Sequence, residues 1–492
     1  MKPEIDFALD LEPDVAKALG YQLIDAVVEY RRRLRDLPAL QRASSVALDP
    51  ALREPLPSGP KDPADVVRRV IDDVLPYMGR PDHPRYFAFV PGPSNIVGVL
   101  ADLMASGFNV FAGTWLEGSG PAAIESTTIE WLAGLAGMPS SAGGVFVSGG
   151  SIANLTALHA ARESRLAPDD RRRAVIYFSD QTHSSIERGL RILGFASDQM
   201  HQVPSTGAFT IDMAALAEAI SSDRAAGRLP FCLISNAGTT NTGAVDPLEA
   251  LADLCGREGL WHHVDGAFGA GAIFSATGRA LLAGLGRADS FSVDPHKWIF
   301  QPYPCGCVIV RDRILLHQAF SIVPEYLKDA HVDPGEVNYW ELSPELTRPF
   351  RALKLWMSLQ VFGADAFGAA VDRGFELAEL AEREVRRLPG WQISSPACMG
   401  VVTFRYATLG MDALVADDLN RRIALALTEN GYAAILTTKI AGRIVVRMCT
   451  LNPRTTDEDI AETISRLDGL AKTLPRKSQA SVEDSREDSH SR

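Results

Sequence analysis

Short apolar runs alternate with stretches of helical periodicity through the middle of this chain, and this alternation constrains the fold more than any other feature. The runs predicted to be strands are Val145–Val147, Val175–Phe178, Phe231–Ser235, Leu260–Val264, Phe291–Val293 and Cys307–Val310. Several are spaced by about 30 residues, the length of a strand with its crossover helix. The last two are too close for a crossover helix, so one strand pair should be antiparallel. The pattern predicts an α/β fold with a mostly parallel central sheet.

Composition and periodicity divide the 492 residues into segments. We expect a helical segment over residues 1–85, a large domain with the central sheet over 86–370, a small α/β domain over 371–475 and a disordered tail over 476–492. The tail is rich in Ser, Asp, Glu and Arg and lacks aromatic residues, so it cannot bury a core. The length of the chain also favours several domains over one compact core.

The flanking segments contain elements of their own. The apolar stripe of Val15–Leu37 predicts an amphipathic helix, and Asp62-Pro63 opens a second helix over Ala64–Leu75. A proline-rich linker between them contains Pro50, Pro55, Pro57 and Pro60. In the small domain we expect strands at Val401–Arg405 and Ile444–Arg447, and helices at Leu419–Thr428 and Asp457–Lys472.

The charge and cysteine content limit the classes of partner. A formal net charge of −12 argues against nucleic acid or an anionic membrane as the main partner. The chain has no run of 18 apolar residues and no apolar signal segment at its N-terminus, so we expect no membrane span and no secretion. The six cysteines form no disulfide framework, which favours the cytoplasm. Cys305-Gly-Cys307 lacks a second ligand pair nearby, so we expect no metal site.

Residues able to carry chemistry follow several of the predicted strands. They are Ser148-Gly-Gly-Ser151 after the first run, His183 after the second, Asn236–Gly243 after the third, Asp265 after the fourth, and His296-Lys297 after the fifth. Taken singly, each has an ordinary explanation: a turn, a capping or core histidine, a helix cap, or a solvated lysine. Their arrangement at the strand ends of one α/β unit calls for a common explanation.

Pyridoxal phosphate (PLP) chemistry supplies that explanation. Lys297 can hold the cofactor aldehyde covalently, and Asp265 can keep the pyridine nitrogen protonated so that the ring accepts electrons. His183 offers a flat group for the ring face. The Gly149–Ser151 turn before a helix offers backbone N–H groups and the helix dipole for a phosphate.

The chain resembles the group II PLP-dependent amino-acid decarboxylases of the aromatic-L-amino-acid decarboxylase type over residues 15–473. The motifs that carry the resemblance are His83-Pro84 with Tyr86-Phe87, Ala101-Asp-Leu103, Ser179-Asp-Gln-x-His-Ser-Ser, His263-Val-Asp-x-Ala, Asp289-Ser-Phe with Pro295-His-Lys-Trp298, and Arg348-x-Phe-Arg-x-Leu-Lys354. The combination is highly specific. It implies fold type I, the PLP transferase fold, in a homodimer whose active site lies at the subunit interface, with the N-terminal helical segment wrapped around the partner.

The resemblance also implies a role for each matching residue. Lys297 would hold the cofactor, Asp265 would pair with the ring nitrogen, and His183 would stack on the ring near the substrate carboxylate. The remaining cofactor contacts would be Ala267 beside the ring, Thr240 near the phenolic oxygen, and Gly150, Ser151 and His296 at the phosphate. Tyr339 would be the proton donor on a mobile catalytic loop.

Some positions depart from the family pattern. Asp294 stands where many members carry an Asn that helps to hold the phosphate, and a carboxylate there would repel that group. The loop Asp329–Leu346 matches poorly apart from Tyr339, which stands shortly before Arg348. Gly113 lies in a pocket segment where aromatic-specific members often carry a bulkier residue.

The substrate is predicted from the expected pocket wall. The wall residues are Phe87, Phe89, Phe111 and Trp115, whose alternative role is core packing. They favour an aromatic L-amino acid that is converted to its amine and carbon dioxide. A non-aromatic substrate such as glutamate would need a cation, for which Arg85 is the nearest candidate, and we expect Arg85 to be exposed.

Other functions remain open on the residues alone. An aromatic aldehyde synthase, in which oxygen intercepts the carbanion, uses the same residues. A catalytically silent protein with this fold is disfavoured by the intact Lys297, Asp265 and His183. A nicotinamide-binding protein is disfavoured because no G-x-G-x-x-G follows an early strand.

Overall fold

The central sheet contains seven strands in the order β1-β7-β6-β5-β4-β2-β3, in a computed structural model that describes residues 9–322, 333 and 335–475. The strands are β1 (Gly143–Val147), β2 (Ala174–Ser179), β3 (Met200–Val203), β4 (Leu229–Asn236), β5 (Trp261–Asp265), β6 (Ser290–Val293) and β7 (Gly306–Val310). Strand β7 runs antiparallel to both of its neighbours, and the other pairs are parallel. The expected mostly parallel sheet with one antiparallel strand is therefore confirmed.

Helices cover both faces of this sheet, which explains why its strands are apolar along their whole length. In β2, Ile176 and Phe178 pack with α6 and α7, whereas Val175 and Tyr177 pack with α8 and α9. The helices of this domain are α4 (Ile96–Gly107), α5 (Trp115–Leu135), α6 (Gly150–Arg165), α7 (Ser184–Ile192), α8 (Met213–Ala225), α9 (Leu248–Glu258), α10 (Ala276–Leu281), α11 (Ile314–Phe320) and α12 (Ala352–Phe362).

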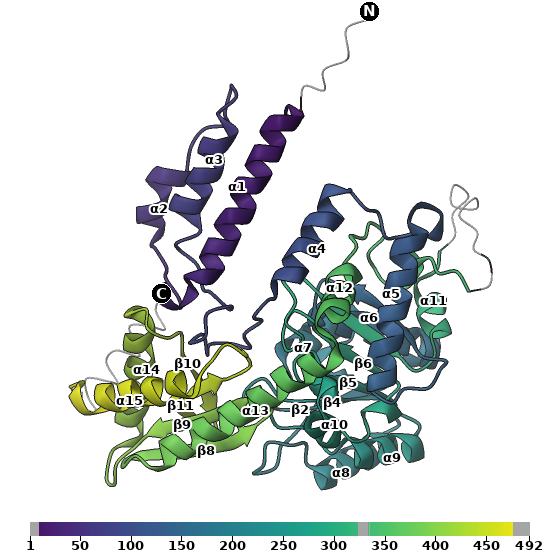
Figure 1. The fold of residues 1–492 in the computed structure, drawn as a ribbon. Helices are drawn as coiled ribbons and strands as arrows, with labels where there is room; N and C mark the ends of the chain where they lie inside the picture. Colours follow the sequence, from purple (N-terminus) through teal and green to yellow (C-terminus); the bar gives the residue numbers. More distant parts are fainter. Residues whose placement is uncertain (1–8, 323–332, 334, 476–492) are drawn as a thin grey trace, which may run out of the picture.

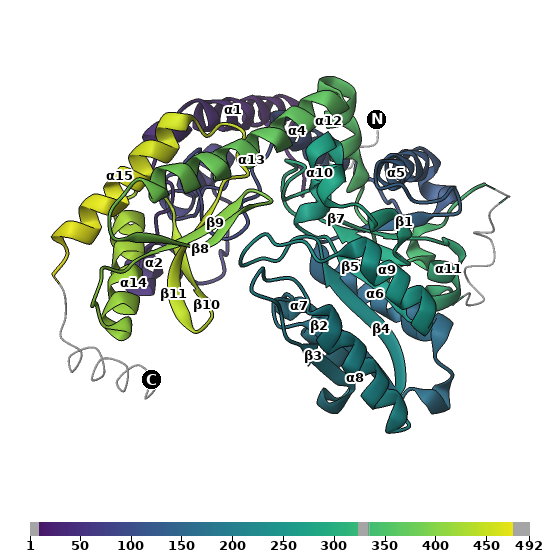
Figure 2. The ribbon, with the colours of Figure 1, turned by 90° about the horizontal axis from the view of Figure 1, so that it is seen from below.

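A second sheet forms the C-terminal part of the described chain. Its four strands are antiparallel, in the order β10-β11-β9-β8. The elements are α13 (Ala364–Arg386), β8 (Trp391–Cys398), β9 (Val401–Tyr406), α14 (Ala413–Glu429), β10 (Leu436–Ile440), β11 (Arg443–Cys449) and α15 (Asp457–Thr473). Helix α13 extends from the large domain to this sheet (Figure 2), so the expected boundary at residues 370/371 falls inside a helix.

The N-terminal helices project from the rest of the molecule (Figure 1). They are α1 (Pro13–Arg32), α2 (Ser45–Leu52) and α3 (Pro63–Arg69), followed by a single π-helical turn, Val70–Val74. Every residue of these three helices is at least partly exposed. The expected linker is partly wrong, because α2 forms within it and contains Pro50; Ser44 caps this helix by accepting a hydrogen bond from the Ala47 N–H.

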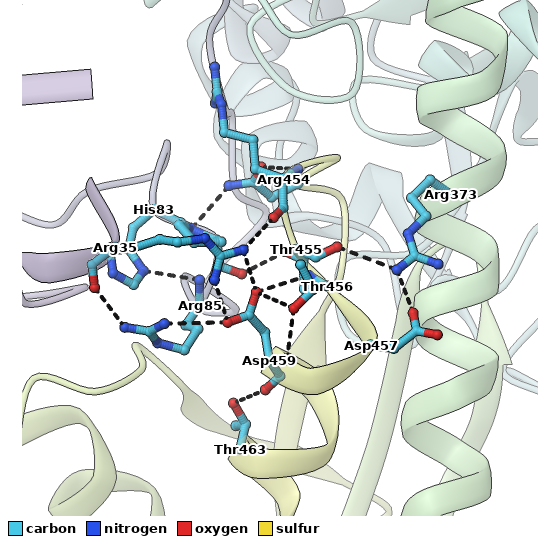
Figure 3. A network of polar contacts seen from close by, with 12 residues as sticks. Arg35, His83, Arg85, Arg373, Arg454, Thr455, Thr456, Asp457, Asp459 and Thr463 are labelled. Atoms are coloured by element: carbon cyan, nitrogen blue, oxygen red, sulfur yellow. Dashed lines mark hydrogen bonds and ion pairs between the residues drawn. The ribbon is translucent and has the colours of Figure 1, made fainter. Parts of the chain in front are cut away.

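A polar network ties the N-terminal segment to the C-terminal domain (Figure 3). Arg35 donates to both carboxylate oxygens of Asp459 at 3.0 Å, and Arg85 donates to the same carboxylate at 3.3 Å. Burial raises the pKa of Asp459, but hydrogen bonds from Arg35 and Thr456 outweigh it, so the net shift is downward. The Arg85 guanidinium also lies 4.5 Å from the ring centre of Tyr432. The expectation that Arg85 is exposed is therefore wrong, because its charge is already engaged.

Candidate active site

A cavity of about 350 Å³ opens at the carboxyl ends of the parallel strands. The residues predicted to bind the cofactor all line it: Gly150, Ser151, His183, Thr240, Asp265, Ala267, His296 and Lys297. They come from the segments that follow β1, β2, β4, β5 and β6, which lie far apart in the sequence. The order of the strands in the sheet brings these segments together, as in other open parallel sheets.

The turn between β1 and α6 forms one wall of the cavity. A Cβ on Gly150 would lie 2.7 Å from the Cβ of Ala267 and 2.9 Å from Oδ2 of Asp294, so only glycine fits there. Among the described residues, no side chain caps the N-terminus of α6. The helix therefore directs its first N–H groups and its dipole toward the cavity, which suits an anion.

Lys297 and His296 follow β6 on the floor of the cavity. The Lys297 Nζ atom lies 3.0 Å from Asp294 Oδ2, and the Lys297 side chain is 25% exposed. The His296 Nδ1 atom lies 2.6 Å from the carbonyl oxygen of Cys305 and 3.2 Å from the Cys305 N–H, so the backbone of Cys305 fixes the orientation of the ring. Burial lowers the pKa of His296 in spite of the nearby Asp294 carboxylate, so the ring is neutral near pH 7.

Asp265 ends β5 and is only 8% exposed. Its Oδ1 atom accepts from the Ala267 N–H at 3.2 Å and from the Ser292 hydroxyl at 3.3 Å. Its Oδ2 atom has no hydrogen-bond partner among the described residues. Burial lowers the pKa of the neighbouring His263 to about 4, so that ring supplies no positive charge. A cation placed in the cavity would give this carboxylate the partner that it lacks.

His183 serves both as a helix cap and as part of the cavity wall. Its Nδ1 atom accepts from the Ser185 N–H at 3.2 Å at the start of α7. Because this nitrogen accepts, the neutral ring carries its proton on Nε2. The capping role considered for this residue is thus real, and it leaves a donor on the side of the ring away from Ser185.

The loop that carries Thr240 is held by the C-terminal domain. Gly243 has a φ of 76°, and a Cβ there would collide with the carbonyl oxygen of Cys398 in the β8–β9 turn. The Thr438 hydroxyl of β10 donates to Asn241 Oδ1 at 2.8 Å. The small domain thus fixes one side of the cavity.

Several cavity residues had no predicted role. They are Ile152, Ser185 and Phe268, together with Asp294, which was predicted only as a departure from the family pattern. Asn236 and Gly238 belong to the predicted segment Asn236–Gly243 but had no role of their own. The amide of Asn236 donates to Ser179 and Thr182 at 3.2 Å, which links the ends of β4 and β2.

Tyr339 does not line this cavity. It lies in a short 3₁₀ turn (Tyr339–Glu341), is 3% exposed, and has its hydroxyl 2.8 Å from the Ser126 hydroxyl. Burial raises its pKa. In the single chain its ring packs under Arg348 at 5.1 Å, and its expected role as a proton donor stays a prediction. Residues 329–332 and 334 of the expected loop lie outside the described residues.

The predicted pocket aromatics also lie outside the cavity of the single chain. Phe87 is 1% exposed and belongs to the core of the C-terminal domain, so for this residue the alternative of core packing is correct. Phe89 is 61% exposed and has a φ of 53°. Phe111 packs edge-on against Trp340 with its ring over Gly113, where a side chain would collide with it, and Trp115 is partly buried beside the main core.

The described part of the chain offers neither a membrane-spanning helix nor a metal-binding cluster. No helix there is long and apolar enough to cross a membrane. No group of three or more His, Cys, Asp or Glu residues there is arranged to hold a metal ion.

Residues 48–407 match the family model of the pyridoxal-dependent decarboxylase conserved domain. The chain is 44% identical to a Bacillus atrophaeus protein named aromatic-L-amino-acid decarboxylase, over 95% of this chain and 97% of the relative. It is 28% identical to an Arabidopsis thaliana protein named phenylacetaldehyde synthase, over 92% of this chain and 95% of the relative.

A crystal structure of Oryza sativa TDC with PLP and tryptamine superposes with a TM-score of 0.89 at 27% identity, covering 94% of this chain and 98% of that chain. Mouse CSAD, at 24% identity and a TM-score of 0.87, shares the fold. The family model and the Bacillus relative both span most of the sequence. The chain therefore belongs to the pyridoxal-dependent decarboxylase family, and it is a carboxy-lyase of fold type I that uses PLP.

Proposed function

We propose that this enzyme removes the carboxyl group of an aromatic L-amino acid in the cavity at the carboxyl ends of the central strands. One observation carries the proposal: Lys297, Asp265, His183 and the Gly149–Gly150 turn converge on a single cavity of about 350 Å³. This volume lies within the range of small-ligand sites.

The residues around the cavity fit PLP. The glycine turn at α6 leaves room for a phosphate, Asp265 Oδ2 lacks a partner, and the Lys297 amine reaches into the same space. When bound, PLP supplies a conjugated ring that takes up the electrons left behind as carbon dioxide departs. Asp294 is the one cavity residue whose charge argues against a phosphate.

Each side chain then has a distinct task. Lys297 would hold the cofactor aldehyde and release it to the substrate amine. Asp265 would stabilise a protonated ring nitrogen, and His183 would offer its Nε2 proton to the substrate. Because Tyr339 is buried away from the cavity, we assign the return of a proton to the substrate Cα atom to His183.

The aromatic substrate is supported by a relative and by the charges of the cavity. The relative at 44% identity is named aromatic-L-amino-acid decarboxylase. Among the described residues, Lys297 is the only lysine or arginine that lines the cavity. A glutamate side chain would therefore lack a cationic partner there, and burying it unpaired would be unfavourable.

We further propose that the enzyme is a homodimer. Helices α1 and α4 expose large apolar side chains, namely Tyr21, Leu23, Val28, Leu103, Met104 and Phe108. An exposed apolar surface of this kind is typical of an interface. A second copy would also bring Phe89, Phe111 or Trp115 toward a cavity that they do not reach within one chain. A cytoplasmic location stays a prediction, supported by six free cysteines.

A substrate panel tests the proposal. Purified enzyme with PLP is incubated with Trp, Phe, Tyr, Dopa and Glu, and carbon dioxide, amine and hydrogen peroxide are measured together. We expect an aromatic substrate to give amine and carbon dioxide in equal amounts. Glutamate as the best substrate would overturn the aromatic assignment. Formation of hydrogen peroxide together with carbon dioxide would favour an aldehyde synthase. The Arabidopsis relative is named as such an enzyme, phenylacetaldehyde synthase.

A further inference from the structure

Asp294 is a buried carboxylate that lies between the Lys297 amine and the N-terminus of α6. It is 2% exposed, and its Oδ2 atom lies 3.0 Å from Lys297 Nζ and 3.6 Å from His296 Nε2. Its Oδ1 atom is buried without a hydrogen-bond partner among the described residues. The same carboxylate lies against Gly150 at the start of α6. It is thus placed next to both the lysine and the turn to which the phosphate is assigned.

Lys297 is the only cation in contact with Asp294 among the described residues. Other ionisable groups around Asp294 have pKa values shifted mainly by burial toward the neutral form: His296, Tyr303, Cys305 and Cys307. Asp265 faces the cavity from β5 with a second negative charge, and α6 contributes Gly150, Ser151 and Ile152, which carry no charge. Lys354, nearby, is engaged by Asp102 at 2.8 Å.

Cofactor binding removes this single partner. To bond with the aldehyde, the Lys297 ammonium must first release a proton, since only the neutral amine has a free electron pair. The amine then adds to the aldehyde carbon; a carbon–nitrogen double bond forms, and the aldehyde oxygen leaves as water with the two remaining amine protons. A phosphate with a charge of about −1.5 to −2 arrives beside Gly150 in the same event. A charged Asp294 would then face an anion without its cation.

We propose that Asp294 takes up the proton released by Lys297 when PLP binds, and that the resulting neutral carboxyl donates a hydrogen bond beside the phosphate. The Oδ2 atom at 3.0 Å is the nearest acceptor for that proton, and the unpartnered Oδ1 atom gives the carboxyl a second free position. Asp294 is thus a positioning residue that makes cofactor retention depend on pH. The inference rests on the proposed roles of Lys297 and the α6 turn.

Proton release on PLP binding tests this. Wild-type apoenzyme and Asp294→Asn apoenzyme are titrated with PLP by calorimetry, in two buffers that differ in ionisation enthalpy and carry no primary amine. In wild type the proton stays inside the site, whereas Asn cannot accept it. The Asn protein should therefore release about one proton more per site. Between about pH 6.5 and 8.5, the affinity of wild type for PLP should fall relative to the variant by up to about tenfold per pH unit.

Asp289→Asn is the matched control, because Asp289 precedes β6 as Asp294 follows it, and it is bonded to the His262 N–H outside the cavity. It should release the same number of protons as wild type. Equal proton release from wild type and Asp294→Asn, or the same excess from Asp289→Asn, would overturn the inference.

Infrared difference spectra of wild type alone provide a second measurement, should Asp294→Asn fail to fold. PLP binding should produce a protonated carboxyl band and remove a carboxylate band, and the absence of that change would overturn the inference. Borohydride reduction separates this result from the function proposed above. Label on a lysine other than Lys297 would refute the proposed site, whereas label on Lys297 with equal proton release would refute only the role of Asp294.

Discussion

Two buried ion pairs in this enzyme, Glu125–Arg348 and Asp294–Lys297, have similar lengths but different surroundings. Glu125 and Arg348 lie 2.6 Å apart with both side chains 0% exposed. Arg348 also donates to the carbonyls of Phe146 and Ala112, at 2.8 and 3.1 Å. Lys297 and Asp294 lie 3.0 Å apart, and the Lys297 side chain is 25% exposed. Glu125 Oε2 and Asp294 Oδ1 both lack a hydrogen-bond partner among the described residues, so the two pairs differ in exposure and in the number of contacts that the cation makes.

The comparison distinguishes an ion pair that holds the fold together, Glu125–Arg348, from one whose lysine is available for the reaction, Asp294–Lys297. Arg348 holds three segments together: α5 through Glu125, the end of β1 through Phe146, and the segment before α5 through Ala112. A charge satisfied on several sides is costly to disturb. In the cavity pair, Lys297 has no ion pair besides that with Asp294 among the described residues, so a ligand that engages Lys297 can break it. An ion pair thus stabilises the core at Glu125–Arg348, whereas in the cavity it leaves the Lys297 amine free to react.

The largest expected effect is that of Lys297→Ala on activity. The variant loses the covalent attachment of the cofactor, so turnover should fall on the order of 10⁴-fold or more. The visible absorption band of the holoenzyme should disappear, while the Glu125–Arg348 pair and the fold remain. Lys439→Ala, at an exposed position in β10, serves as the control. A Lys297→Ala protein that kept the band and the turnover would place the chemistry elsewhere.

Asp265→Asn should come next. The change preserves shape but removes the charge that stabilises a protonated ring nitrogen, at a cost on the order of 3–5 kcal/mol. That cost should appear mainly in kcat, as a fall of about 10²- to 10³-fold, because the electrons are taken up in the chemical step. The measurement is steady-state kinetics with saturating PLP. Near-normal turnover would show that Asp265 only accepts the Ala267 N–H.

Arg348→Met should act on stability. Removing one partner leaves Glu125 charged and enclosed, so the free energy of unfolding should fall by about 3–5 kcal/mol in urea titrations. Arg383→Met is the control, since Arg383 and Glu379 form an exposed pair at 3.9 Å worth at most about 0.5 kcal/mol. Adding Glu125→Gln to Arg348→Met should restore part of the loss. Equal losses from Arg348→Met and Arg383→Met would show that the Glu125–Arg348 pair contributes no more to the scaffold than an exposed pair does.

Tyr339→Phe should have the smallest effect. It removes the hydrogen bond between the Tyr339 and Ser126 hydroxyls and keeps the ring under Arg348, so the loss of stability should be about 1 kcal/mol. Amine should remain the product, because the hydroxyl lies outside the cavity. Product analysis under air checks this. A shift toward aldehyde and peroxide would show that Tyr339 does reach the reacting carbon.

Most strands that sequence analysis recovered differ physically from those that it missed. Strands β2, β4, β5 and β6 lie inside the sheet and are covered on both faces, so each is an apolar run. Strand β1 is a recovered edge strand, and its residues Gly144–Val147 are buried as well. The missed strands, β3, β8 and β10, are all edge strands. Their sequences, such as Met200-His-Gln-Val203, are more polar, and β8 contains Pro396, which an edge strand tolerates.

The candidate site shows a similar division. Asp265 ends a strand, and Gly150, His183 and Lys297 each stand within four residues after one, so local order and the topology of a parallel sheet were enough to place them together. Tyr339 and Phe87 depend on contacts with segments far away in the sequence, namely Ser126 and the core of the C-terminal domain. The sequence near these residues gives no information on such contacts, and for that reason their positions outside the cavity of the single chain were not predicted.

The attachment point of the cofactor tests the account most directly. The purified holoenzyme is reduced with borohydride, which fixes the bond between PLP and its lysine, and is then digested and mapped by mass spectrometry. The account predicts a single phosphopyridoxyl label, on Lys297, and none in the Lys297→Ala protein. A label on any other lysine, or a protein that binds PLP without one, would contradict it.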